Sequence, residues 1–213
     1  MLASLAKRED VETIVYSATL GDAGKCGNPP VCTKEELPHV RKKELEQATV
    51  ILGVDHVITG TYPDGKLPEY EKQLVDSICH IIEQYKPSVV VTFPPHGISG
   101  HRDHQAIQRA TYQAVKAMDH IVEQLYYVTV VGRPDRYGDP IENIDIVFTF
   151  TDEEAKKCVK RCSRTVRNIY RSNVYFQLFI MIRFISFKIA NTSSAHGQKK
   201  ASHLIHFKNN LRV

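Results

Sequence analysis

Residues 88–104 read SVVVTFPPHGISGHRDH, and this stretch decides the fold class of the chain. The first six residues form a continuous apolar run, which is typical of a strand covered on both faces in a parallel sheet. A loop with two prolines and two glycines follows. A helix is then expected from about His104 to Met118, because apolar residues recur there at helical spacing. The order strand, loop, helix predicts one unit of an open α/β sheet.

The segments on either side of this stretch alternate in the same way. Strands are expected at 11–18, 56–59, 125–131 and 144–150, and helices at about 38–52, 74–85 and 151–162. The first long helix should begin near Pro38 and stop at Gly53. This alternation predicts an α/β protein with a Rossmann-like, open and mostly parallel sheet that carries helices on both faces.

Length and composition indicate an ordinary globular protein. The chain has 213 residues, of which 42% are hydrophobic and 24% charged, so disordered, collagen-like and coiled-coil classes are excluded. No stretch reaches the roughly 18 apolar residues that a membrane span requires. The N-terminus becomes charged after six residues, which is too soon for a signal peptide. Five cysteines without any C-x-x-C pair argue against a zinc ribbon and for reduced thiols, so a cytoplasmic location is expected.

Charge divides the chain into two unlike parts. Residues 1–154 contain 15 Lys and Arg against 24 Asp and Glu, a net charge of −9, whereas residues 155–213 contain 13 Lys and Arg and no acidic residue. The last part is also rich in Phe and Ile without a helical or strand period. We therefore expect one domain over residues 1–172 and a basic tail, 173–213, outside it. An exposed run at 176–187 should promote aggregation.

The densest cluster of chemically useful side chains is His96, His101, Asp103 and His104. It follows a parallel strand and opens a helix, which is where an open α/β sheet places its ligand crevice. Imidazole suits zinc, and a helix N-terminus favours an anion such as a reaction oxyanion. These residues therefore predict a functional site, and solvated loop histidines are the alternative.

Arg41 and Glu44 lie three positions apart near the start of a helix, so they can share one face. From the residues alone, this pair is read as a surface ion pair. The glycines at 21, 24 and 27 do not match a phosphate-binding pattern, so a plain irregular loop is expected there. Cys158 and Cys162 are read as ordinary helix residues.

Several motifs occur in one order along residues 1–170. They are Thr19-Leu20-Gly21-Asp22-Ala23-Gly24, Arg41-x-x-Glu44-x-x-x-Ala48, Asp64-Gly65-x-Leu67, Lys86-Pro87 and Gly100-His101-Arg102-Asp103-His104. In this order they resemble the LmbE-like, PIG-L-type family of zinc-dependent N-acetylglucosamine deacetylases. The resemblance implies a metal-dependent hydrolase that removes the acetyl group from an N-acetylglucosaminyl conjugate, a small-molecule substrate. Nucleic acid is not expected as a partner.

The resemblance also implies a role for each matching residue. His104 would ligate zinc, while His101 would stabilise the oxyanion or protonate the leaving amine. Asp103 would support the two histidines. Arg41, with Glu44, would bind the substrate. Zinc lowers the pKa of its bound water toward about 7 and polarises the acetyl oxygen, which makes this chemistry coherent.

The sequence departs from the family at two places. Family members begin with a central strand ending in His-Pro-Asp-Asp-Glu, which supplies the other two zinc ligands and the base, and residues 1–213 contain no such motif. The sheet is therefore expected to lack its first strand, and zinc binding and turnover are expected to be weak. The polar markers of a later family segment are also missing at 163–166.

Two other classes of function remain open at this point. One is a non-catalytic α/β module whose basic segment binds nucleic acid or an anionic membrane surface. The other is a different zinc amidohydrolase, for which Asp22 and Asp64 would have to converge on His101 and His104. In the deacetylase interpretation, His101 and His104 lie at the C-terminal edge of the sheet and face the same cleft as Arg41.

Overall fold

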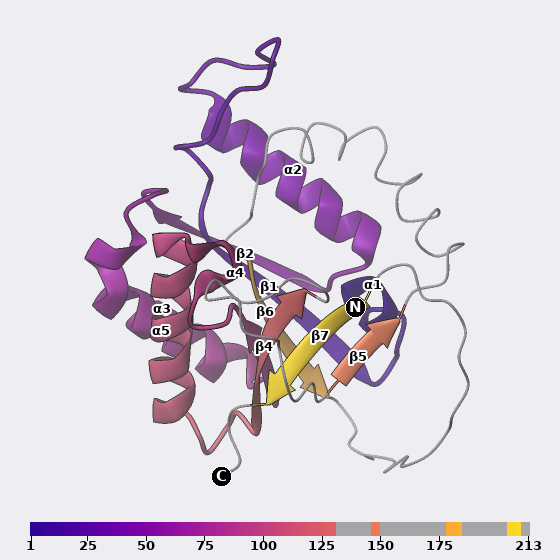
Figure 1. Cartoon of the computed structure of the whole chain (residues 1–213). Helices are drawn as coiled ribbons and strands as arrows, with labels where there is room; N and C mark the ends of the chain where they lie inside the picture. The colour runs from indigo at the N-terminus through magenta and orange to yellow at the C-terminus, as the bar shows by residue number, and fades with distance from the viewer. Residues whose placement is uncertain (131–145, 150–177, 185–203, 210–213) are drawn as a thin grey trace.

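The computed structural model describes residues 1–130, 146–149, 178–184 and 204–209 (Figure 1). The elements in chain order are α1 (Leu2–Leu5), β1 (Val11–Thr19), α2 (Leu37–Leu52), β2 (His56–Tyr62), the 3-10 turn η1 (Leu67–Tyr70), α3 (Glu71–Tyr85), β3 (Val89–Thr92), α4 (Gly97–Gly100), α5 (Arg102–Ala117), β4 (Gln124–Val130), β5 (Ile146–Thr149), β6 (Leu178–Phe184) and β7 (Leu204–Asn209). Every strand and helix expected before residue 150 is therefore present. The helix expected at 151–162, with Cys158 and Cys162, lies outside the described residues, as does segment 163–166.

The described strands form one sheet in the order β2-β1-β6-β3-β4-β7-β5. β1 pairs with β2 and β3 pairs with β4 in parallel, while β6 and β7 are antiparallel to each of their neighbours. Among the described strands, β1 to β5 consequently run in one direction and β6 and β7 in the other. The α/β class and the open sheet agree with the sequence-based expectation.

Two described strands come from the segment 173–213. Its composition predicts a tail outside the domain, and the absent family motif predicts that the sheet lacks its first strand. In the structure, β6 lies between β1 and β3, with Ile180 opposite Val15 on one side and Val91 on the other. β7 joins β4 to β5. The physical reason is that ladder pairing needs extended backbone rather than side-chain periodicity, and unpaired edges of β1 and β3 would leave buried amides without partners.

Local sequence signals set the ends of the long helix α2. The Thr33 N–H donates to Glu36 Oε2 at 2.9 Å, and the Glu36 N–H donates to Thr33 Oγ1 at 3.3 Å, which is a capping box just ahead of the helix. At the other end, Gly53 adopts φ 77°, and its N–H bonds back to the last turn. α2 and α5 have 16 residues each. In the part of the chain that is described, no helix is long and apolar enough to cross a bilayer.

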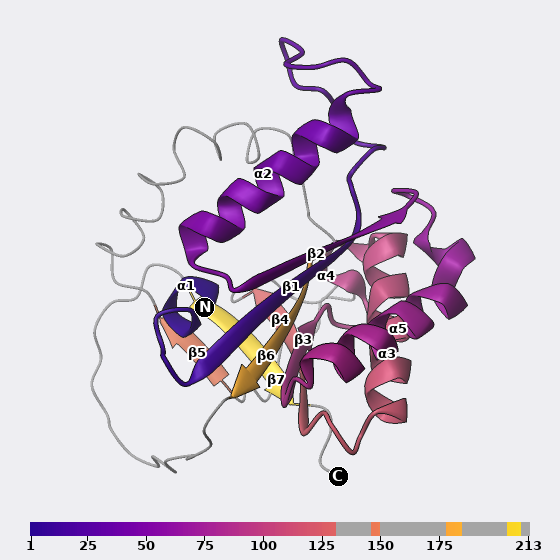
Figure 2. The same cartoon turned by 180° about the vertical axis from the view of Figure 1, so that it is seen from behind.

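Helices cover the two faces of the sheet unequally. α3 and α5 lie side by side on one face, and α1 and α2 lie away from them on the other (Figures 1 and 2). The main apolar cluster joins α3 and α5 to alternate residues of the strands. It includes Ile78 of α3, Ile107 of α5 and the strand residues Ile14 and Leu125. A smaller cluster contains Leu5 of α1 and strand residues on the other face of the sheet, namely Val11, Val89, Val91 and Tyr126. The alternation along each strand thus separates two cores.

Replacing Ile107 by Ala tests the larger core. Ile107 is fully buried in α5, so Ile107→Ala should lower the free energy of unfolding by about 2–5 kcal/mol through lost burial and a residual cavity. The matched control is Val50→Ala on α2, where the side chain is 78% exposed and the change should stay within about 0.5 kcal/mol. Urea unfolding followed by circular dichroism measures both. Equal effects of the two substitutions would contradict this packing.

Candidate functional site

Three loops meet at one edge of the sheet. β1, β2 and β3 run in the same direction, so the loops that follow Thr19, Tyr62 and Thr92 all leave from the carboxyl edge. Open α/β sheets bind their ligands at this edge. The first two loops carry Asp22 and Asp64, and the third leads through α4 to the histidines. The structure therefore places the predicted histidines at the expected edge.

Asp103 is the residue that ties these loops together. Its side chain is completely buried in the first turn of α5. Oδ2 accepts a hydrogen bond of 2.7 Å from the N–H of Gly65, and Oδ1 accepts one of 3.2 Å from the N–H of Leu67. Two amide donors and the positive end of the α5 dipole stabilise the buried carboxylate. Asp103 therefore fixes the loop after β2 against the helix that carries His101 and His104.

His104 is buried and held in one tautomer. Its Nδ1 lies 3.0 Å from the carbonyl oxygen of Gly97, and a carbonyl can only accept, so the proton is on Nδ1 and the lone pair is on Nε2. The ring stacks on Phe93, with centroids 4.2 Å apart and planes 3° from parallel. Burial lowers the pKa of His104, which the Gly97 carbonyl and Asp103 only partly oppose. This neutral form, with Nδ1 bound to a carbonyl, is the one in which histidine ligates metals.

His101 adopts the opposite tautomer. It caps the N-terminus of α5, and its Nδ1 accepts a hydrogen bond of 3.3 Å from the N–H of Asp103. The proton of the neutral ring must then be on Nε2, which makes this atom a donor. The two rings lie close together, with centroids 4.9 Å apart. Neighbouring imidazoles thus offer a hydrogen-bond donor on His101 and a lone pair on His104.

The backbone of the preceding loop makes this arrangement possible. Gly97 has φ 67°, and a Cβ built on it would lie 2.9 Å from the Cβ of His104, so only glycine allows its carbonyl to approach the ring. Ile98 follows with φ 61°, an unfavourable value for a branched residue. Its N–H donates to His96 Nδ1 at 3.1 Å. The third histidine of the cluster therefore supports the loop.

Asp22 and Asp64 come together beside this group. The N–H of Asp64 donates to Asp22 Oδ1 at 3.0 Å, and the Asp64 carboxylate accepts from the N–H of Ala23. Burial raises the pKa of Asp64, the charges of Asp103 and Asp22 raise it further, and His101 acts in the opposite direction. Both carboxylates thus approach the His101–Asp103 group from neighbouring loops. Among the described residues, however, no set of three His, Cys, Asp or Glu side chains is placed to hold a metal ion.

Arg41 and Glu44 form a buried pair, whereas the residues alone suggested a surface ion pair. Their side chains are 5% and 12% exposed, and Arg41 Nη1 donates to Glu44 Oε2 at 2.9 Å. Arg41 Nη2 donates to the carbonyl of Lys25 at 3.3 Å. The spacing correctly predicted that the two residues share a face, but their burial depends on the loop that folds over them.

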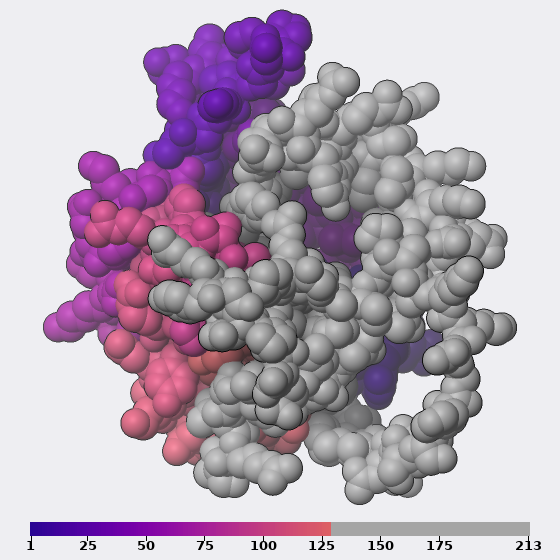
Figure 3. Space-filling model, in the orientation of Figure 1, coloured from indigo at the N-terminus to yellow at the C-terminus, as the bar shows by residue number. Residues whose placement is uncertain are grey.

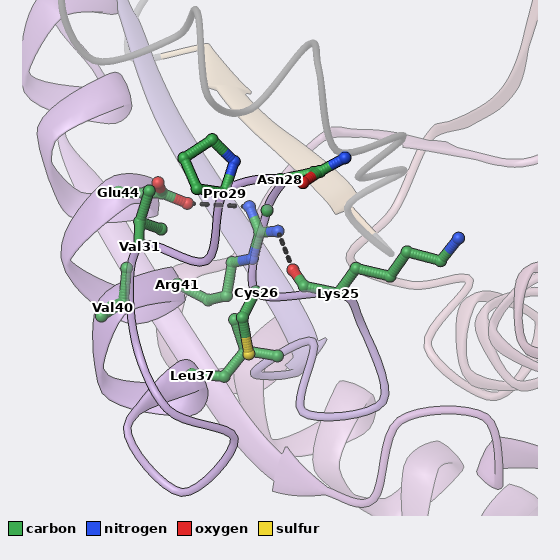
Figure 4. A pocket seen from close by; sticks show the side chains of 10 residues that line it. Lys25, Cys26, Asn28, Pro29, Val31, Leu37, Val40, Arg41 and Glu44 are labelled. Atoms are coloured by element: carbon green, nitrogen blue, oxygen red, sulfur yellow. Dashed lines mark hydrogen bonds and ion pairs between the residues drawn. The ribbon is translucent and has the colours of Figure 1, made fainter.

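That loop and α2 enclose a pocket of about 440 Å³ (Figure 4). Its lining consists of Lys25, Cys26, Gly27, Asn28, Pro29, Val31, Leu37, Val40, Arg41 and Glu44. The pocket formed by this loop could not be predicted, because the glycines and prolines of residues 24–30 indicate only irregular backbone. Neither His101 nor His104 lines the pocket, so a single cleft shared with Arg41 remains a prediction. The two groups are linked by the Gly21–Asp22 loop, since a Cβ on Gly21 would touch Arg41 Cγ at 3.7 Å.

The fold and this edge define an α/β protein with a histidine–aspartate site at the carboxyl end of parallel strands. Residues 1–115 match the sequence profile of PIG-L, described as GlcNAc-PI de-N-acetylase, and the chain belongs to this family. The family expected from the motifs is thereby confirmed.

Similar proteins agree with this family. The chain is 37% identical over 112 residues to a probable N-acetyl-alpha-D-glucosaminyl L-malate deacetylase 2 of Bacillus anthracis, covering 51% of this chain and 49% of that protein. The corresponding Bacillus cereus protein is 33% identical over 137 residues, with 61% of each chain covered. The chain therefore spans about half to three fifths of these relatives. The N,N'-diacetylchitobiose deacetylase of Pyrococcus horikoshii has the same fold, with a TM-score of 0.55, 19% identity and coverage of 78% of this chain and 64% of that one.

The two tautomers can be observed directly. We expect long-range ¹H–¹⁵N spectra above pH 8 to show His104 protonated on Nδ1 and His101 protonated on Nε2, because the Gly97 carbonyl and the Asp103 amide leave no other choice. The exposed His120 serves as a reference ring. Finding the same tautomer at His101 and His104 would show that one of these hydrogen bonds does not form.

A pair of glycine substitutions tests the close approach of Gly97 to His104. Gly97 and Gly65 both have positive φ, but a Cβ on Gly65 meets nothing within 4 Å. Both alanine variants should lose about 1–2 kcal/mol of unfolding free energy from the backbone. Gly97→Ala should lose about 1–3 kcal/mol more, because its Cβ overpacks against His104. Denaturant unfolding compares the two, and equal losses would contradict the close contact.

Proposed function

We propose that this chain is an N-acetylglucosaminyl deacetylase that hydrolyses the acetamide of a small amino-sugar conjugate. Family membership and the Bacillus relatives support this assignment. In it, His101 and Asp103 serve catalysis, Arg41 and Glu44 bind the substrate, and His104 is a metal ligand. A cytoplasmic location, which reduced cysteines favour, belongs to the same proposal.

The observation that carries the proposal is the pair of opposite tautomers at His101 and His104. In amide hydrolysis, water adds to the acetyl carbon, an oxyanion forms, and the carbon–nitrogen bond breaks as the amine takes up a proton. A preorganised donor stabilises such an oxyanion or protonates the leaving nitrogen. His101 Nε2–H has the required form, because the Asp103 amide occupies Nδ1. Asp103 acts through position, since its two oxygens hold the loop after β2.

Arg41 and Glu44 suit the substrate role because the pocket beside them combines both charges with apolar walls. A carboxylate such as Glu44 accepts hydrogen bonds from sugar hydroxyls, while a guanidinium favours a carboxylate on the conjugate. The conjugates named for the Bacillus relatives carry malate, an acid of this kind. We therefore propose a conjugate with an acidic aglycone.

Zinc is the metal that the resemblance implies, and His104 fits one ligand position. A catalytic zinc takes three protein ligands. The described residues bring no three suitable side chains together, and the His-Pro-Asp-Asp-Glu motif does not occur in residues 1–213. The described residues therefore do not form a complete zinc site by themselves, and we assign no catalytic step to the metal. The alternative of a nucleic-acid or membrane module depends on the basic segment and remains an expectation.

Zinc content and acetate release test the proposal together. Residues 1–213 should retain little zinc after dialysis and should release little acetate from N-acetylglucosaminyl L-malate, because one imidazole holds the metal weakly. A version extended at its N-terminus by a strand ending in His-Pro-Asp-Asp-Glu should bind one zinc and release acetate. In that version His104→Ala should lose the metal. His101→Ala should keep it but lose about 10²–10⁴-fold in rate.

The exposed His120 provides the control, and His120→Ala should change neither zinc nor rate. Stoichiometric zinc in residues 1–213 that disappears in His104→Ala would show that this chain completes the site itself. An extended protein that binds zinc but releases no acetate from any N-acetylglucosaminyl conjugate would refute the proposed activity.

A further inference from the structure

The wall of the Arg41 pocket contains two cysteines that the proposed chemistry does not use. Cys26 lines the pocket, and Cys32 follows six positions later in the same loop between β1 and α2. Figure 4 shows Cys26 beside Arg41 and Leu37. The loop projects at the top of the molecule in Figure 3, at its surface. Neither cysteine forms a disulfide, and both side chains are partly exposed.

The backbone brings the two cysteines together. The N–H of Val31 donates to the carbonyl of Cys26 at 2.8 Å, which closes the loop and places Cys32 next to its start. The Cys26 side chain lies near enough to that of Cys32 to affect its pKa. Burial raises the pKa of Cys32, the Cys26 contact and the charge of Glu36 raise it further, and Arg41 acts in the opposite direction. The structure thus holds the two thiols near each other in a short, closed loop.

Other contacts hold this loop in place without the thiols. Lys34 Nζ donates to the carbonyl of Gly24 at 2.7 Å, and Arg41 Nη2 donates to the carbonyl of Lys25. The residue that precedes Cys26 is therefore bound to the guanidinium of the pocket. A chemical change at Cys26 acts on a segment that Arg41 already contacts.

We propose that Cys26 and Cys32 form a reactive dithiol pair that small-molecule disulfides oxidise to an intramolecular disulfide. The Cys26 thiolate attacks a disulfide RSSR, which forms a Cys26–SR bond and releases one RS⁻. The Cys32 thiolate then attacks Cys26 Sγ, which forms the Cys26–Cys32 bond and releases a second RS⁻. Two thiols of the protein are oxidised, one RSSR is reduced to two RSH, and the two protein protons are taken up by the leaving thiolates.

The modification alters the pocket in two stages. The mixed disulfide places the R group on a residue of the pocket lining, and closure of the ring removes it and locks the loop. If the Arg41 pocket binds substrate, as the proposed function holds, oxidation regulates access to it. The pairing of the two cysteines does not depend on that function. In a reducing cytoplasm, such disulfides are transient and serve as sensors or catalysts.

Cys79 offers a matched comparison within the described residues. It is a half-buried cysteine on α3, and burial together with the charges of Asp76 and Glu83 raises its pKa. Burial raises the pKa of Cys32 as well, so thiolate formation does not distinguish the two sites, whereas a neighbouring thiol does. Cys79 has no partner thiol adjacent in its helix. It should therefore form no intramolecular disulfide, while the two loop cysteines do.

Oxidised glutathione and peptide mass mapping test the pair in the full chain. Trypsin cuts after Lys25 and Lys34, so peptide 26–34, CGNPPVCTK, contains both cysteines and no other. After oxidation, acid quenching and alkylation, this peptide should lose the mass of two hydrogens and resist alkylation. It should form this internal disulfide under conditions in which Cys79 stays alkylatable or carries only a mixed disulfide. Cys32→Ser should accumulate glutathione on Cys26, and Cys79→Ser should behave as the original chain.

The outcomes separate this proposal from the deacetylase assignment, because the mapping needs no substrate. The proposal is overturned if peptide 26–34 keeps two alkylatable thiols while Cys79, Cys158 or Cys162 is oxidised. It is also overturned if Cys32→Ser, shown by circular dichroism to be folded, accumulates no mixed disulfide. A Cys26–Cys32 disulfide in a chain without deacetylase activity would leave the pair established and refute only its regulatory consequence.

Discussion

The buried carboxylate of Asp103 is the interaction on which the site depends. A charge without water is tolerated only when it is fully hydrogen-bonded, and two backbone amides from the loop after β2 meet this requirement. The bonds connect segments about forty positions apart in the chain. They orient the first turn of α5, so that His101 caps the helix and His104 faces the Gly97 carbonyl. The positions of the two histidines at the edge of the sheet thus depend on the hydrogen bonds of Asp103.

The position of β6 in the sheet satisfies the backbone hydrogen-bonding groups of the two strands beside it, β1 and β3. β1 and β3 are apolar strands whose backbones require hydrogen bonds on both sides, and β6 supplies them from the far end of the chain. β6 runs antiparallel to both neighbours and takes a central position in the sheet. The first strand of the family is also expected at a central position. Because the carboxyl ends of β1, β2 and β3 still coincide, this insertion leaves the loops of the site on one edge.

The site consists of two linked groups with different physical characters. One contains the histidines and Asp103 and offers directed protons and lone pairs in a buried setting. The other contains Arg41 and Glu44 and offers paired charges in a pocket walled by a loop. Asp22 and Asp64 connect them through a hydrogen bond between two loops. This division agrees with the proposed deacetylase activity, in which one part would bind the body of the substrate and the other would act on the reacting bond.

The sequence by itself determined the strands and helices up to residue 130, because their apolar periods and capping signals are local. It also located the cluster around His101, since a parallel strand followed by a helix fixes the edge at which its loop lies. Only the tertiary structure decided which ring nitrogen of each imidazole carries the proton. The acceptor for His104 and the donor for His101 are backbone groups, and the spacing of residues in the sequence does not show where these groups lie. It likewise decided the burial of Arg41, which a separate loop covers, and the place of β6. Strand pairing joins residues that are distant in the chain. The composition of residues 173–213 therefore does not predict that β6 pairs with β1 and β3.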